Sequence, residues 1–143
     1  MAKHILTVLG YVVATFATQA TSHFLINTRH YAEVGFMRRD PIFLLGILSM
    51  VIEGAVLSYL YSALPKSRNW LTDGVKFGWL AGAFAFGYIG LSEAAKYQVP
   101  SIGSWILVEA LSTFVQFTIF GVFAGFIHRG DATATGAVLT DKE

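Results

Sequence analysis

The side chains in this sequence that could do chemistry are polar and ionisable residues inside long apolar stretches. They are Gln19, His23, Glu53, Glu93, Glu109 and Gln116. A charged group near the centre of a membrane span costs roughly 2.5–3.5 kcal/mol on insertion scales, so such residues usually face other helices or water. Carboxylates and an imidazole brought together can exchange protons, bind a cation or join helices by hydrogen bonds.

Glu53 lies deepest among the carboxylates. We call the membrane side that holds the N-terminus side A and the opposite side side B. His23 and Glu93 lie near side B, whereas Glu53 lies about 18 Å from it at 1.5 Å per residue. This gradient predicts a polar funnel or pocket that opens to side B. At its depth Glu53 should be protonated, or paired with His23, Gln116 or a bound cation.

These residues also have structural explanations. Glu93 precedes Lys96 by three residues, which favours an ion pair at the membrane interface. His23 and Glu109 could serve only as hydrogen-bonded packing residues between helices. Glu53 is the hardest to explain in this way, because at its depth it cannot readily reach the headgroups.

Metal, cofactor and catalytic sites are not indicated. One His and three Glu from four stretches resemble the ligand set of helix-bundle carboxylate sites, but those use a Glu-x-x-His spacing that is absent here. His23 is the one histidine within an apolar stretch, which disfavours haem. No nucleophile, metalloprotease or phosphate-binding motif occurs. We therefore expect no metal, no cofactor and no enzymatic activity, and the net charge of +1 disfavours nucleic acid as a partner.

The elements that carry these residues are four apolar runs. The sequence is 55% hydrophobic and 13% charged, against about 25% charged in soluble domains. The runs cover about 5–27, 41–64, 75–96 and 102–127, and each reaches the roughly 20 residues that cross a bilayer. The prediction is an all-α bundle of four transmembrane helices over residues 1–129. The small, polar residues 130–143 predict a disordered tail.

The basic residues indicate the orientation. Four spans return the C-terminus to side A, and basic residues are more numerous there than on side B. Because basic loops tend to stay in the cytoplasm, we expect both termini to be cytoplasmic.

Small residues recur at four-residue spacing in the last two runs. They are Gly74, Gly78 and Gly82 in the third run and Gly121 and Gly125 in the fourth. Such stripes let helix backbones approach closely in lipid. The glycines could therefore pack the helices of one bundle, or pack the bundle against a second copy or a partner.

The two halves of the chain show weak internal similarity. Residues 48–60 align with 111–123 and pair Glu53 with Gln116, while Ser22-His23 falls on Ser92-Glu93. Both hairpins would run in the same direction, as in parallel repeats of transporters. The alignment leaves open whether the bundle is two parallel-repeat helical hairpins.

The layout resembles that of small four-span bacterial membrane proteins of uncharacterised function. The stretches that carry this resemblance are "SHFLINTRHY" (22–31), "RRDPIFLLG" (38–46) and the third run, rich in glycine and aromatic residues. The resemblance implies a bacterial inner-membrane location and brings no assigned activity.

Two functions remain open. The first and favoured one is a non-catalytic accessory or structural subunit, a homo-oligomer or part of a larger membrane assembly, that packs through its glycine stripes. The alternative is a small proton- or cation-coupled transporter that uses the Glu/His cluster from the non-cytoplasmic side.

Overall fold

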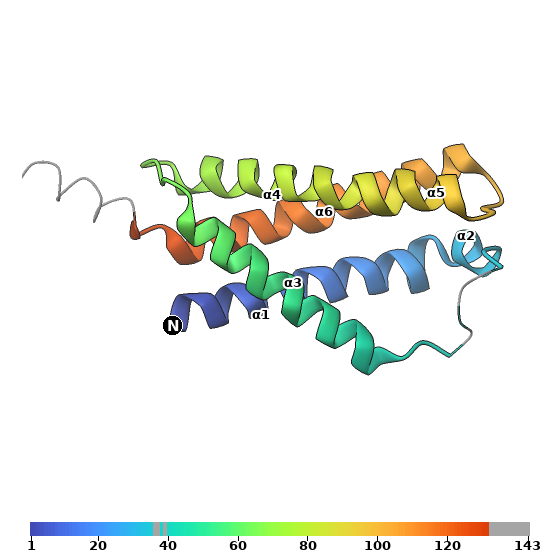
Figure 1. The fold of residues 1–143 in the computed structure, drawn as a ribbon, viewed down its shortest axis with the longest axis horizontal. Coiled ribbons are helices and arrows are strands. Elements are labelled where there is room, and N and C mark those ends of the chain that lie inside the picture. Colours follow the sequence, from blue (N-terminus) through green and yellow to red (C-terminus); the bar gives the residue numbers. More distant parts are fainter. Residues whose placement is uncertain (36–37, 39, 132–143) are drawn as a thin grey trace, which may run out of the picture.

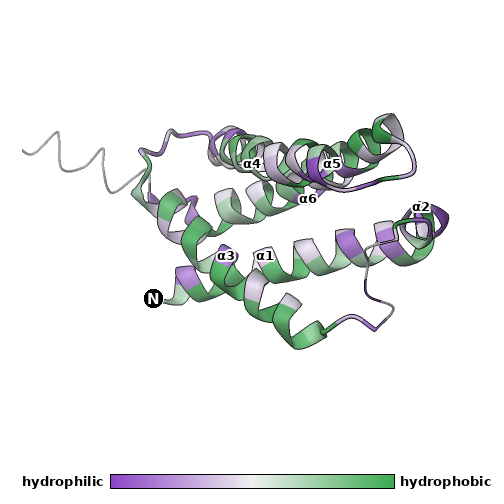
Figure 2. Cartoon of the chain, turned by 45° about the vertical axis from the view of Figure 1, so that its right-hand side comes forward, coloured by the Kyte–Doolittle hydropathy of each residue, from purple (hydrophilic) through white to green (hydrophobic). Residues whose placement is uncertain are grey.

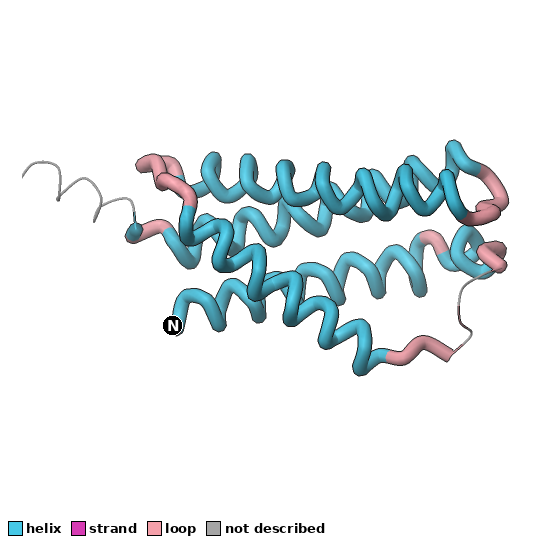
Figure 3. Tube along the Cα trace, in the orientation of Figure 1, coloured by secondary structure: helices cyan, strands magenta, loops and turns pink. Residues whose placement is uncertain are grey.

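The protein is an arrangement of helices whose structure we describe for residues 1–35, 38 and 40–131 of a computed structural model (Figures 1 and 3). The helices are α1 (Ala2–Thr21), η1 (Ser22–Ile26), α2 (Thr28–Ala32), α3 (Phe43–Ala63), α4 (Trp70–Phe86), η2 (Gly87–Ser92), α5 (Glu93–Lys96) and α6 (Ile102–His128). Here η marks a π-helical segment; both such segments lie towards the side-B ends of their spans. No strand occurs in the described ranges.

Four helical stretches are long and apolar enough to cross a membrane: Ala2–Ile26, Phe43–Ala63, Trp70–Lys96 and Ile102–His128. The chain is therefore an integral membrane protein whose outer surface contacts lipid, and the predicted all-α four-helix bundle is confirmed. Figure 2 shows hydrophobic residues along most of each helix and hydrophilic ones gathered at the connections.

The ends of the spans differ somewhat from the predicted ones. The third span begins at Trp70 rather than at residue 75, because the Asn69 side chain caps it by accepting from the backbone N–H of Thr72 at 3.1 Å. The second begins at Phe43, two residues later than expected. Of the predicted tail, the structure describes Gly130 and Asp131, and Asp131 pairs with Lys3; residues 132–143 lie outside the described residues.

Glycines bring α4 and α6 into backbone contact. A Cβ at Gly74 would overlap the carbonyl oxygen of Gly121, and one at Gly78 would overlap that of Phe117. Gly125 faces the backbone of Trp70 in the same way. Since only glycine leaves room for this approach, the stripe holds two helices of the same chain side by side (Figure 1).

The core lies where α1, α4 and α6 meet the C-terminal part of α3. Its buried aromatic members are Tyr11, Tyr61, Phe77, Phe117 and Phe120. The Tyr11 and Phe120 rings meet edge to face with centroids 5.1 Å apart, an arrangement that their quadrupoles favour.

α3 is the peripheral helix. It packs mainly on α1 and little on α6, and it reaches α4 near its C-terminal end, where the Tyr61 and Phe77 rings lie 5.0 Å apart. In Figure 1 it crosses α1 obliquely, whereas α4 and α6 run side by side. The two hairpins of the proposed repeat are therefore packed differently.

The glycine contact predicts a large effect for the smallest substitution. Gly78→Ala should lower the free energy of unfolding by about 1–3 kcal/mol, the usual cost of overpacking a close contact. Thermal or denaturant unfolding in detergent measures this change. The matched control is Gly46→Ala on α3, where a Cβ meets nothing within 4 Å, and it should be neutral or slightly stabilising. Equal losses in both variants would contradict the close contact.

Candidate functional site

A stripe of polar side chains follows one face of the first span. Its members are Thr7, Tyr11, Thr15, Gln19 and Ser22. Their spacing of three or four residues puts them on a single helical face. Each is hydrogen-bonded to a side chain of another helix, which satisfies polar groups that lipid cannot.

Halfway along this stripe lies a cleft of about 670 Å³ between α1, α3, α4 and α6. Its lining is mostly apolar and aromatic. The polar members are Tyr11, Thr15, Gln19, Glu53, Tyr88, Thr113 and Gln116. An apolar pocket with a few convergent polar groups is the usual form of a small-molecule site.

Glu53 lies on the α3 wall of this cleft, near the middle of the helix. Its Oε2 accepts a hydrogen bond from the Tyr11 hydroxyl at 2.6 Å, and its Oε1 accepts one from Ser49 Oγ at 2.7 Å. The hydrogen bonds of Glu53 thus come from the phenol on α1 and the hydroxyl one turn earlier on α3, rather than from the expected His23 or Gln116. The other expected alternatives, protonation or a bound cation, stay predictions. The Glu53 side chain nevertheless remains exposed, so a ligand in the cleft can reach it.

Amide and hydroxyl groups line the opposite wall. Gln19 Nε2 donates to Gln116 Oε1 at 2.9 Å, and Gln116 Nε2 donates to Thr15 Oγ1 at 2.9 Å. Gln116 is almost fully buried, and these bonds fix its amide. The two residues paired by the internal similarity, Glu53 and Gln116, therefore line one cleft from different helices.

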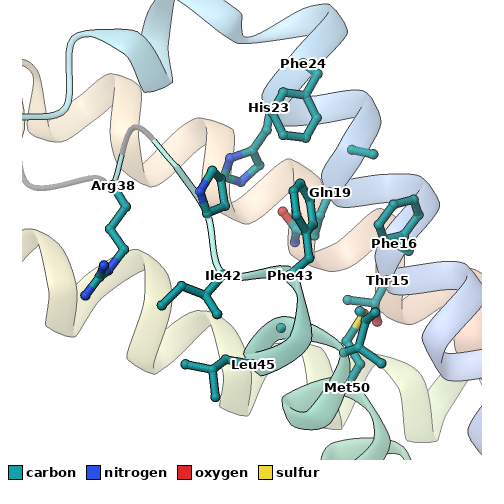
Figure 4. Close-up of a pocket in the computed structure, with 14 residues that line it drawn as sticks. Thr15, Phe16, Gln19, His23, Phe24, Arg38, Ile42, Phe43, Leu45 and Met50 are labelled. Carbon is teal, nitrogen blue, oxygen red and sulfur yellow. The ribbon is translucent and has the colours of Figure 1, made fainter.

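A second hollow of about 640 Å³ lies between α1 and the start of α3 (Figure 4). Thr15 and Gln19 line it as well as the cleft. His23 and Arg38 are its ionisable lining residues. The hollow thus borders the first part of α3, residues 43–50, and the cleft borders its second part, residues 52–60.

The remaining predicted residues lie near side B. Tyr31 of α2 donates to Glu109 Oε1 at 2.8 Å and stacks on the His23 ring with centroids 3.5 Å apart. Ser22 and Ser112 are joined across the helices at 2.9 Å. Only 4% of Glu109 is exposed, so this acid is sealed beneath α2.

The structure therefore divides the predicted polar set into two groups. The expected funnel towards side B is covered at that end by Tyr31 and Trp105, which are both buried. The cleft that holds Glu53 instead faces sideways, between α3 and α4, which meet nearer side A, where Tyr61 packs on Phe77. The spacing of residues along the sequence could not predict the cover at side B, because α2 reaches it through tertiary contacts.

Glu93 belongs to neither group. It is half-buried at the start of α5, and the described ion pairs do not include the expected one with Lys96. The Lys96 ammonium instead lies over the Tyr88 ring, 5.0 Å from its centroid.

Sequence reasoning missed a network at side A. His128 Nδ1 lies 2.8 Å from Asp131 Oδ2, and His128 Nε2 lies 3.2 Å from Thr7 Oγ1, while Lys3 also pairs with Asp131. Thr7 is fully buried, so no substrate reaches this Thr-His-Asp arrangement, and it ties the start of α1 to the end of α6. The polar stripe on α1 could have been predicted from the sequence, because Thr7, Tyr11 and Thr15 recur at four-residue spacing.

No metal centre is apparent in the described ranges, where no three His, Cys, Asp or Glu side chains are grouped to hold an ion. No family model, curated protein or solved structure matches the chain. The resemblance to small four-span bacterial proteins stays a prediction, and the site must be interpreted from its own geometry.

The contact between Tyr31 and Glu109 predicts strong coupling. Tyr31→Phe should lower the free energy of unfolding by about 1–3 kcal/mol, because it leaves a buried carboxyl without its donor. In a Glu109→Leu background the same change should cost much less, which a double-mutant cycle by detergent unfolding detects. Tyr59→Phe, on an exposed ring, is the matched control. Additive effects would show that the two residues do not stabilise each other.

The side-A network predicts a pH-dependent stability. Burial alone would raise the pKa of Asp131, but hydrogen bonds from Lys3 and His128 outweigh it and hold this pKa below its ordinary value. A lowered carboxyl pKa stabilises the fold above the ordinary pKa, and that contribution disappears as the pH falls through the folded value.

Asp131→Asn should therefore lower the Tm at pH about 7, and the difference from the wild type should shrink as the pH falls below about 4. Glu33→Gln, which removes a surface ion pair with Arg29, serves as the control. A difference in Tm that stays constant with pH would contradict the assignment.

Proposed function

We propose that this protein is a small proton-coupled membrane transporter, in which the cleft binds the solute and Glu53 exchanges the proton. The observation that carries the proposal is a carboxylate at mid-membrane depth that remains exposed to a cleft of substrate size. Ionisable residues at this depth commonly mark proton or substrate pathways.

The partners of Glu53 support this role. Its two hydrogen bonds come from neutral hydroxyls, and the described ion pairs leave this carboxyl without a cation. A carboxylate in apolar surroundings with no fixed countercharge is stabilised by taking up a proton or a cationic ligand. Either exchange makes its charge depend on what occupies the cleft.

The position of α3 supports a moving element. The first turns of α3 are exposed and border the hollow, whereas its other end is held by Tyr61 in the core, so the start of the helix can swing relative to the α4–α6 pair with little loss of packing. Rocking of one helical unit against another around a central site is the common form of alternating access.

The accessory-subunit hypothesis has weaker support. It rested on glycine stripes available to a partner, whereas the glycines of α4 and α6 contact each other's helices. We retain the proposals that both termini lie in the cytoplasm and that the membrane is a bacterial inner membrane.

The transporter proposal predicts a flux that depends on Glu53. The protein is reconstituted into vesicles that contain a pH-sensitive dye, and proton movement is followed on addition of cationic, anionic and neutral solutes in turn. At least one solute should drive proton flux in the wild type, and Glu53→Gln should reduce it to the level of empty vesicles. Glu33→Gln keeps the charge change but lies at the surface, and should leave the flux unchanged. No flux with any solute, or full flux in Glu53→Gln, would refute the proposal.

A further inference from the structure

The cleft contains one acid and no base. Among the described residues that line it, Glu53 is the one that ordinarily bears a charge near neutral pH, and none is Lys, Arg or His. An anionic ligand would find no countercharge there and would face the Glu53 carboxylate. A cation finds a partner in Glu53.

Aromatic rings line the same cleft. They are Tyr11, Phe77, Phe84, Tyr88 and Phe117. Ring faces attract cations, most strongly where water is excluded. Tyr88 already receives the Lys96 ammonium, which lies near side B and does not line the cleft. The rest of the lining is aliphatic and suits an apolar ligand body.

The cleft opens to the lipid rather than to bulk water. Phe84 on α4 is 86% exposed, and Ile52 and Val56 on α3 are 56% and 53% exposed, so both walls carry lining residues that face outwards at membrane depth. Towards side B the bundle is covered by the buried ring of Tyr31. A solute already dissolved in the bilayer therefore has the direct route.

We propose that the solute is a lipophilic organic cation that enters from the bilayer between α3 and α4 and pairs with Glu53. This inference rests on the proposed function, because it names the substrate class of the same cleft. A monovalent cation that binds the protonated form displaces the Glu53 proton to water and pairs with the carboxylate, so that form releases one proton for each cation bound. One carboxyl group cannot hold the proton and pair with the cation at the same time. Because each displaces the other, movement of the cation is coupled to movement of the proton.

The groups around Glu53 permit this exchange. On α1 the facing titratable group is the Tyr11 phenol, and on η2 it is the Tyr88 phenol. α3 contributes the Ser49 hydroxyl, and α6 contributes Gln116 and Thr113, none of which titrates. The described lining from α4 is apolar. The single proton that cation binding can displace is therefore that of Glu53.

The test uses two ions of nearly the same size and opposite charge, tetraphenylphosphonium and tetraphenylborate. Each is equilibrated by dialysis against the full chain in lipid nanodiscs, with empty nanodiscs as the blank. The wild type should bind the cation at least tenfold more tightly than Glu53→Gln, and neither protein should bind the anion above the blank. A pH indicator in weak buffer should report proton release on cation binding, up to one proton per cation.

Two further variants keep the test decisive. Glu33→Gln should bind like the wild type, since it changes charge away from the cleft. Ala85→Phe fills the cleft without changing charge and should also weaken cation binding, which covers the case in which Glu53→Gln fails to fold. Equal binding of both ions, or cation binding that Glu53→Gln and Ala85→Phe both leave intact, would overturn the inference.

The outcomes separate this inference from the transporter proposal. Glu53-dependent cation binding without any flux in vesicles would keep the substrate class and remove transport. Glu53-dependent flux driven only by anionic or neutral solutes would keep transport and remove the substrate class.

Discussion

The close contact of α4 with α6 is the constraint on which the rest of the bundle depends. Gly78 and Gly121 let these two backbones touch, so the two helices lie closer together than larger side chains would allow. α1 adds to this pair through its polar stripe and through the Tyr11 ring. α3 packs mainly on α1 and reaches the pair near its C-terminal end, where Tyr61 lies against Phe77. Towards side B from this contact, the space between α3 and α4 is the cleft.

The two deep acids differ in their access rather than in their chemistry. Glu109 is sealed by α2 and receives the Tyr31 hydroxyl, an arrangement that fixes the side-B end. Glu53 also accepts hydroxyl donors, yet its side chain stays open to the cleft. Since burial prevents exchange of ligands or protons, the exposed acid is the one suited to function. We therefore propose that Glu53 exchanges protons and ligands, whereas Glu109 stabilises the fold.

Much of the fold could be predicted because bilayer thickness and hydropathy determine span length, and all four spans were found that way. The depth of Glu53 followed from the same count. Its partners did not, because Tyr11 lies 42 positions away and reaches it only through the crossing of α1 and α3. The cover over side B was missed for the same reason. The five residues of α2 are too few to show a helical pattern, and Tyr31 reaches Glu109 and His23 only in the folded chain.

The most direct test of the central claim is the reaction of the protein with an apolar carbodiimide, which partitions into lipid and modifies protonated carboxyl groups. Mass spectrometry of peptides from labelled protein in nanodiscs identifies the modified acid. The account predicts modification at Glu53, with the sealed Glu109 spared. Modification of Glu109 with Glu53 untouched would contradict the claim that the cleft exposes a proton-exchanging acid to the bilayer.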